Sequence, residues 1–200
     1  MRKEKSKESK LYKIILSRRT IRLFRKIKVS RSIVRNIIDS ARLAPSSANL
    51  QFIEYLVVDK PSLNSDVFSC VKFGGYVFPR RVPDKKRAPS FYIIILINKN
   101  KSKKPDLRDV GAAAQNILLS LACFGLGGCW IANINRIRLR KLLKIPRHLI
   151  IDSVIACGPA AEHPILEERA DKIRYWLDNN NRLHVPKRPL KEILHYNNFP

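Results

Sequence analysis

The fold is decided by an uninterrupted apolar run, FYIIILI at residues 91–97. A strand without polar alternation is typical of one that is covered on both faces of its sheet. A wide apolar stripe follows at helical spacing, and it predicts a central helix that begins at Asp106 or Asp109 and packs on more than one side. Because helical and strand patterns alternate along the chain, the sequence predicts a layered α+β or α/β fold.

The remaining elements follow from periodicity and from turn residues. Further strands are predicted at residues 52–58, 129–132 and 153–157, and helices at residues 11–17, 61–70 and 138–143. Another helix begins at Ser30, which can cap it, and ends before Pro45. Residues 71–90 form a long basic loop, and the glycine-rich residues 125–128 form a turn. We expect a basic tail at residues 1–10 and a single domain at residues 11–200.

The positive charge of the chain is its unusual bulk property. Two hundred residues with 45% hydrophobic composition suffice for one globular domain, but the net charge is +24. This charge favours a solvated, lysine-rich surface, and the alternative is a protein that attracts nucleic-acid phosphates without sequence preference. We do not expect nucleic acid to be the partner, because no RNP-like motif, helix-turn-helix signature or zinc-finger spacing is present.

Cysteine usage and hydropathy indicate the cellular compartment of the protein. Cys70, Cys123, Cys129 and Cys157 form no C-x-x-C pair and lie mostly in apolar runs, which indicates buried free thiols in a reducing compartment. The histidines do not fall at zinc-ligand spacing with them, so we expect no metal. The uncharged window 110–132 is long enough for a membrane span, but polar residues and glycines interrupt it. Since the N-terminus also lacks a secretion signal, we expect a cytoplasmic protein without membrane contact.

Two polar stretches lie beside these apolar elements. RRTIR at residues 18–22 places three guanidinium groups and a hydroxyl close together, and APSSANLQ at residues 44–51 forms a loop between a helix and a strand. Arginine binds phosphate in a bidentate manner, while amide and hydroxyl groups can bind the edge of a ring. The two stretches predict a ligand that is anionic at one end and a planar heterocycle elsewhere.

These stretches carry a resemblance to a known family. RRTIRLF at residues 18–24 and SARLAPSSANLQ at residues 40–51 are similar to the opening of the FMN-dependent nitroreductase family, roughly R-R-S-x-R-x-F and then A-x-x-A-P-S-x-x-N-x-Q-P-W. The resemblance continues in DVGAAAQN at 109–116, GLGGCWI at 125–131 and HVPKR at 184–188. Each motif alone is weak, but the ordered set is specific. One departure is that Phe52-Ile53 stand where the family has Pro-Trp, so the wall of the substrate pocket differs.

The resemblance implies a fold, an assembly and an activity. The fold would be α+β in three layers, with a central mixed sheet flanked by helices, and the assembly an intertwined homodimer with flavin at the subunit interface. The cofactor would be FMN and the co-substrate NAD(P)H. Hydride would pass from nicotinamide to the flavin, and a nitroaromatic, quinone or similar small electron acceptor would then be reduced in a ping-pong mechanism. No side chain is expected to be a strict catalytic residue.

The resemblance also implies which residues hold the phosphate end of the cofactor. Arg18, Arg19 and Thr20 match the first motif and would contact the phosphate or the ribityl chain. Lys187 and Arg188 match the late phosphate-binding position of the family. Charge-assisted hydrogen bonds are about twice as strong as neutral ones, which suits a phosphate dianion. The alternative is that these residues are ordinary surface cations of a very basic protein.

A second group of residues is implied around the flavin ring. Arg22 stands at the position beside the pyrimidine side, where a cation stabilises the negative charge that reduction places there. Asn49 would bind the ring edge, with Ser46 and Gln51 orienting the loop or the ribityl chain, although such residues are also common loop formers. The backbone of Ile131-Ala132 would lie against flavin N5, beside a tryptophan that could instead belong to the core.

Two other functions stay open. A flavin-free basic module that binds nucleic acid would explain the charge. A nitroreductase-fold enzyme of other chemistry, such as a reductive dehalogenase, would share the motifs. Residues 162–184, which include Tyr175 and Trp176, form a charged and aromatic segment that either covers the active site or packs on the surface.

Overall fold

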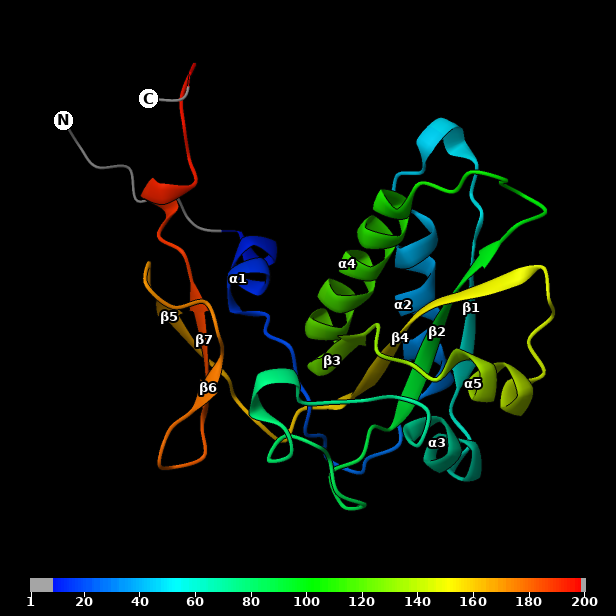
Figure 1. The fold of residues 1–200 in the computed structure, drawn as a ribbon, viewed down its shortest axis with the longest axis horizontal. Coiled ribbons are helices and arrows are strands. Elements are labelled where there is room, and N and C mark those ends of the chain that lie inside the picture. Colours follow the sequence, from blue (N-terminus) through cyan, green and yellow to red (C-terminus); the bar gives the residue numbers. More distant parts are fainter. Residues whose placement is uncertain (1–8, 199–200) are drawn as a thin grey trace.

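Helices cover both faces of a central four-stranded sheet (Figure 1). The computed structural model describes residues 9–198, so most of the predicted basic tail lies outside the described residues. The sheet order is β1-β2-β4-β3, with β1 at Ile53–Val58, β2 at Phe91–Asn98, β3 at Leu126–Ile131 and β4 at Leu149–Pro159. Every residue of β2 is buried, which confirms the strand predicted to be covered on both faces.

Two apolar clusters fill the layers on either side of this sheet. The helices are α1 at Lys10–Ser17, α2 at Arg31–Arg42, α3 at Pro61–Phe68, α4 at Leu107–Cys123 and α5 at Arg136–Leu143. On one face α2 packs on α4, with Ile37 and Ile117 in the shared cluster. On the other face lie α3 and α5, with Val67 and Leu139 in the second cluster. The arrangement confirms the three-layer α+β fold.

Side-chain caps set where the helices begin. The Ser30 hydroxyl accepts a hydrogen bond from the Ile33 N–H at 3.4 Å at the start of α2, as predicted. Asp106 caps α4 by accepting from the Arg108 N–H at 3.0 Å, which decides between the two candidate aspartates. Asp109 lies in the first turn of α4 and is buried, so it has another role.

The RRTIR segment is attached to the sheet through its backbone. The four named strands of the central sheet pair antiparallel, and parallel pairing enters at the β3 edge, where Thr20 forms a bridge with Gly128. The Ile21 N–H donates to the Gly128 carbonyl at 3.0 Å, and the Arg25 N–H donates to the Pro159 carbonyl at 2.8 Å. The motif therefore has a fixed path along the sheet edge.

The glycine segment is mostly strand, which corrects the turn predicted at residues 125–128. Gly125, at φ 69°, turns the chain after α4, and β3 begins directly afterwards at Leu126. A Cβ on Gly127 would stand 2.5 Å from Cγ1 of Ile21, and one on Gly128 would stand 2.8 Å from Leu118 of α4. These glycines permit close packing of β3 against two neighbours, and this requirement is not visible in the local sequence.

A second, three-stranded sheet was not predicted. β5 (Ile165–Glu168) pairs parallel with β7 (Leu183–Lys187), and β6 (Trp176–Leu177) pairs antiparallel with β7. This small sheet stands at the left of Figure 1, to the side of the central sheet. The charged segment 162–184 therefore has regular structure of its own.

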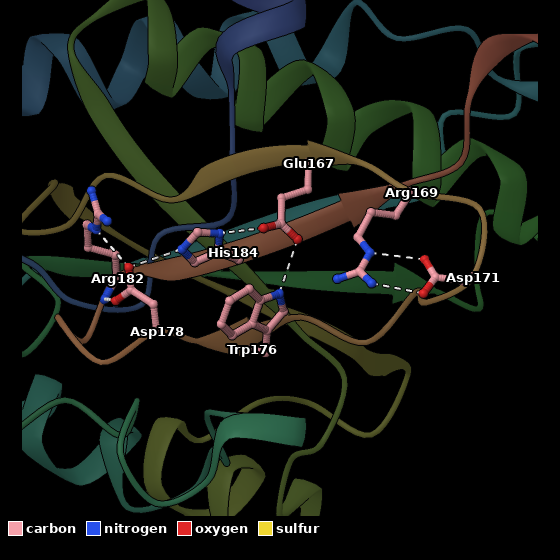
Figure 2. A network of polar contacts seen from close by, with 7 residues as sticks. All are labelled: Glu167, Arg169, Asp171, Trp176, Asp178, Arg182 and His184. Atoms are coloured by element: carbon pink, nitrogen blue, oxygen red, sulfur yellow. Dashed lines mark hydrogen bonds and ion pairs between the residues drawn. The ribbon is translucent and has the colours of Figure 1, made fainter.

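A polar network centred on His184 ties the small sheet together (Figure 2). His184 of β7 contacts Glu167 of β5 through Nδ1 at 2.6 Å and Asp178 through Nε2 at 3.2 Å. The Trp176 indole N–H donates to Glu167 at 3.1 Å, and the Trp176 and His184 rings stack at 4.4 Å. Side chains rather than long strands thus define this sheet.

The burial of the cysteines and the lengths of the helices test the predictions about free thiols and membrane spans. Cys70, Cys129 and Cys157 are buried free thiols, as predicted, whereas Cys123 is exposed. Among the described helices, none combines the length and apolar character needed to cross a membrane. The cytoplasmic location stays a prediction.

Replacing Gly127 by alanine is expected to lower the free energy of unfolding by about 1–3 kcal/mol, because Ile21 must move to admit the methyl group. Urea denaturation measures the change. Gly111→Ala is the matched control, since a Cβ there meets no atom within 4 Å and alanine is favoured over glycine in a helix by about 1 kcal/mol. Equal stability of Gly127→Ala and the unmodified protein would contradict the packing argument.

Acid is expected to destabilise the small sheet by protonating two of its carboxylates. Hydrogen bonds from the Arg182 backbone and side chain lower the pKa of Asp178 to about 2, and a hydrogen bond from Trp176 lowers the pKa of Glu167. A carboxylate whose pKa is lowered on folding contributes stability above its unfolded pKa of about 3.9, and that stability is lost as pH falls toward the folded pKa.

Trp176 fluorescence in a Trp130→Phe background should therefore change between about pH 4 and pH 2. Asp178→Asn removes one of the titrating groups and should shrink this acid transition. An identical acid profile with and without Asp178→Asn would show that the network does not hold the sheet.

Candidate functional site

A cavity of about 220 Å³ lies where the RRTIR segment, α4 and β3 meet. The chain that leaves β4 closes its remaining side. The lining residues come from these segments: Ser17, Arg18, Arg19, Ile21, Leu118, Ala122, Leu126, Gly127, Gly128, Ala160, Glu162, His163 and Pro164. Two of the predicted phosphate-binding arginines therefore share one cavity.

Arg18 and Arg19 bring positive charge that is not neutralised by a carboxylate within residues 9–198. Burial lowers the pKa of Arg18, and the neighbouring charge of Arg19 lowers it further, while burial alone lowers the pKa of Arg19. Arg19 Nη1 donates to the carbonyls of Leu16 at 2.7 Å and Arg18 at 2.6 Å, and its Nε is buried without a partner. Two adjacent, half-buried guanidinium groups with unused donors form a site for an anion.

The carboxylate in this cavity is engaged elsewhere. Glu162 Oε1 accepts hydrogen bonds from the backbone N–H groups of Arg22 at 2.5 Å and Leu23 at 3.1 Å. Its Oε2 lies 3.5 Å from Arg81 Nε, and both side chains are 5% exposed. Arg81 also donates to the Asn181 carbonyl, in the turn between β6 and β7 of the small sheet. Sequence reasoning missed this pair, whose only local signal is a lone carboxylate after an apolar strand.

Arg22 lies next to the cavity and makes a different contact. Its guanidinium carbon stands 4.7 Å from the centroid of the Tyr175 ring. Thr20, between the cavity arginines and Arg22, is held by its bridge to β3. The charged and aromatic segment 162–184 thus reaches the RRTIR motif.

The APSSANLQ loop is anchored on α4 by Asp109. The Asp109 carboxylate accepts hydrogen bonds from the Ser46 hydroxyl at 2.8 Å and the Ser47 N–H at 2.9 Å. Ser46 Oγ in turn accepts from the Gln51 N–H at 3.1 Å. Because the Ser46 hydroxyl bonds both Asp109 of α4 and the Gln51 N–H, it holds the loop on the helix. Asp109 is a supporting residue that the sequence indicated only as a helix opener.

The tip of this loop is strained and exposed. Ala48, Asn49 and Gln51 have φ angles of 49°, 55° and 47°, in the left-handed region that non-glycine residues rarely occupy. Gln51 Nε2 donates to Asn49 Oδ1 at 3.0 Å, and both side chains are exposed. Strain held in an exposed polar loop is typical of a binding site.

The two motifs do not meet within one copy of the chain. The loop binds α4 at Asp109, whereas the cavity contacts α4 at Leu118. These positions are about 14 Å apart along the helix at 1.5 Å per residue. Figure 1 shows the loop, in cyan, near one end of α4 and the start of β3 at the other end.

The other predicted residues lie outside the cavity. Ile131 is buried at the end of β3, and Ala132 after it is exposed. Lys187 ends β7, and Arg188 is exposed and binds Glu192 through Nε at 3.4 Å. The neighbouring Trp130 is 45% exposed and donates to Ser153 at 2.7 Å, so it is not a core residue.

Other hollows fit an anion less well. One of about 450 Å³ lies between α2 and β1, but two of its three arginines are neutralised by carboxylates that line it, Arg31 by Asp59 at 2.8 Å and Arg42 by Asp39 at 2.6 Å. Among the described residues, no group of three or more His, Cys, Asp or Glu side chains could hold a metal ion.

Comparison with known proteins identifies the family of the chain. The sequence model of the Nitroreductase family matches residues 15–158, which is more than half of the chain. The chain belongs to the Nitroreductase family. A protein of Archaeoglobus fulgidus, provisionally named NADH dehydrogenase/NAD(P)H nitroreductase, is 29% identical over 182 residues, which cover 88% of this chain and 97% of that protein.

Solved nitroreductase structures share the fold. One from Desulfovibrio desulfuricans, in complex with FMN, is 25% identical with a TM-score of 0.68, covering 96% of this chain and 99% of that one. An FMN-dependent nitroreductase from Clostridium difficile R20291 is 26% identical with a TM-score of 0.67, covering 93% and 98%. The family predicted from the ordered motifs is thereby confirmed.

Proposed function

We propose that this chain binds FMN and uses NAD(P)H to reduce nitroaromatics, quinones or similar electron-poor acceptors in a ping-pong mechanism. Family membership and the FMN-bound relative support the proposal. The observation that carries it is the pair of adjacent cavity arginines, Arg18 and Arg19, which lack a carboxylate partner among the described residues. An acceptor panel with NADH and NADPH separates this activity from reductive dehalogenation on the same fold.

The phosphate end of FMN fits the cavity chemistry. Arg18 and Arg19 would donate to phosphate oxygens, and an anionic oxygen would satisfy the buried Arg19 Nε. Thr20, fixed at the sheet edge, would contact the phosphate or ribityl chain. Lys187 and Arg188 would add cations from the C-terminal segment.

The ring end of FMN requires different groups. When bound, FMN supplies the acceptance and release of hydride. Asn49 would hydrogen-bond the ring edge, with Ser46 and Gln51 holding the loop in the strained form that presents it. Arg22 would stabilise negative charge on the reduced ring, and the Ile131-Ala132 backbone would lie against it.

We further propose a homodimer in which the loop of one copy completes the cavity of the other. The 220 Å³ cavity is smaller than the roughly 300 Å³ at which small-molecule pockets begin, so it holds only part of a nucleotide. α1 has no buried residue and exposes Leu11, Tyr12, Ile15 and Leu16 by 43–57%. Such an apolar face suits burial against a second copy.

Purified protein is expected to be yellow, with absorbance near about 450 nm from bound FMN. Arg18→Ala should weaken FMN binding about ten- to hundredfold, because a charge-assisted hydrogen bond is lost. Fluorescence titration measures the affinity, and Arg42→Ala, whose partner Asp39 lies away from the cavity, is the matched control. Colourless protein with salt-sensitive retention on nucleic acid would instead support the basic binding module.

Mixing two inactive variants tests the shared site. Arg18→Ala removes a cavity cation, and Asn49→Gly removes the loop amide while tolerating the left-handed backbone. If each site takes Arg18 from one copy and Asn49 from the other, a mixed dimer has one intact site and one doubly changed site. NAD(P)H-dependent reduction should recover to about half the unmodified rate per dimer. Absence of recovery in verified mixed dimers would contradict the shared site.

A further inference from the structure

Two neighbouring aromatic rings, with a guanidinium group at either end, form a row that leads from Arg22 to the surface. Arg22 Cζ lies 4.7 Å from the Tyr175 ring centroid, and the Tyr175 and Tyr76 ring centroids are 5.1 Å apart. Arg174 Cζ then lies 5.2 Å from the Tyr76 centroid. Because the face of an aromatic ring is negative, each guanidinium is attracted to the ring that it covers. The row joins the RRTIR segment to loop 71–90 and to the chain before β6.

Tyr175 also contacts loop 71–90 through its hydroxyl. The hydroxyl donates to the Gly74 carbonyl at 3.2 Å and accepts from the Tyr76 N–H at 3.3 Å. A Cβ at Gly75 would collide with this oxygen, and Gly75 has φ 40°, so the short turn at Gly75–Val77 is shaped around the Tyr175 side chain. In Figure 1 the loop between α3 and β2 reaches across to β6, where this turn contacts the small sheet.

We propose that Tyr175 is a positioning residue with two separable roles. Its ring holds the guanidinium of Arg22, and its hydroxyl latches loop 71–90 against the small sheet. The first role rests on the proposed function, because it matters through the flavin ring beside Arg22. The second role concerns the protein alone.

The latch has a consequence for access to the site. Tyr76 and Phe78 on the latched loop are 61% and 69% exposed. Their rings stand in the same segment that the Tyr175 hydroxyl fixes, close in the chain to its two hydrogen bonds. A planar electron acceptor that approaches Arg22 would therefore meet the Tyr175 and Tyr76 rings, and the position of Tyr76 depends on Tyr175.

Two substitutions at one position separate the roles. Tyr175→Phe keeps the ring and loses both hydrogen bonds, so the Tyr76 amide should exchange with solvent about tenfold faster in flavin-free protein. The Asn98 amide, bonded to the Phe52 carbonyl at 2.8 Å in the central sheet, lies outside the latched loop and is the internal reference. The flavin midpoint potential of this variant should match that of the unmodified protein.

Tyr175→Leu loses the ring as well, and its flavin midpoint potential should fall toward that of Arg22→Ala. Tyr196→Phe, at a 77% exposed tyrosine, is the matched control and should alter neither readout. Unchanged Tyr76 exchange in Tyr175→Phe would overturn the latch, and an unmodified potential in Tyr175→Leu would overturn the positioning of Arg22. Protein that binds no FMN would overturn the proposed function and the flavin role of Tyr175, while Tyr76 exchange would still decide the latch.

Discussion

The buried carboxylate of Glu162 is the constraint on which the site depends. A charge removed from water is tolerated only when opposite charge and hydrogen-bond donors surround it. Here the backbone N–H groups of Arg22 and Leu23 occupy one oxygen, and Arg81 stands beside the other. These contacts fix the RRTIR segment and loop 71–90 relative to each other, and Arg81 extends the link to the small sheet through Asn181. Since Glu162 is held by these groups, it does not pair with Arg18 or Arg19, whose charges stay available for a ligand.

The layers of the fold could be predicted because their signals are local. The apolar run of β2 is contained in one short segment of the chain, and so are the stripe of α4 and the Ser30 cap of α2. The small sheet has strands of only two to five residues, and it depends on contacts such as His184 with Glu167, so no periodic pattern announces it. The turn predicted at Gly127 is wrong for a related reason. Glycine is needed there because Ile21, far away in the sequence, leaves no room for a Cβ.

The site divides in the same way. The arginines of RRTIR and the polar residues of APSSANLQ are recognisable as motifs, since their chemistry is carried by adjacent side chains. Their supports are distant: Asp109 holds the loop from α4, and Arg81 reaches Glu162 from another loop. A motif thus identifies the groups that we propose to contact a ligand, whereas the groups that hold them in place emerge only from the fold.

The repulsion between Arg18 and Arg19 connects this architecture to binding. Burial disfavours the charged form of both guanidinium groups and lowers the pKa of each, and the charge of Arg19 lowers the pKa of Arg18 further. The fold sustains this arrangement because the backbone of the segment is fixed at the sheet edge by Gly128 and Glu162. A dianion bound there would relieve the repulsion and would satisfy the buried Arg19 Nε at the same time. The unfavourable free energy of placing two cations in the empty cavity would therefore add to the affinity for an anionic ligand, because the rigid β3 edge keeps the two guanidinium groups together.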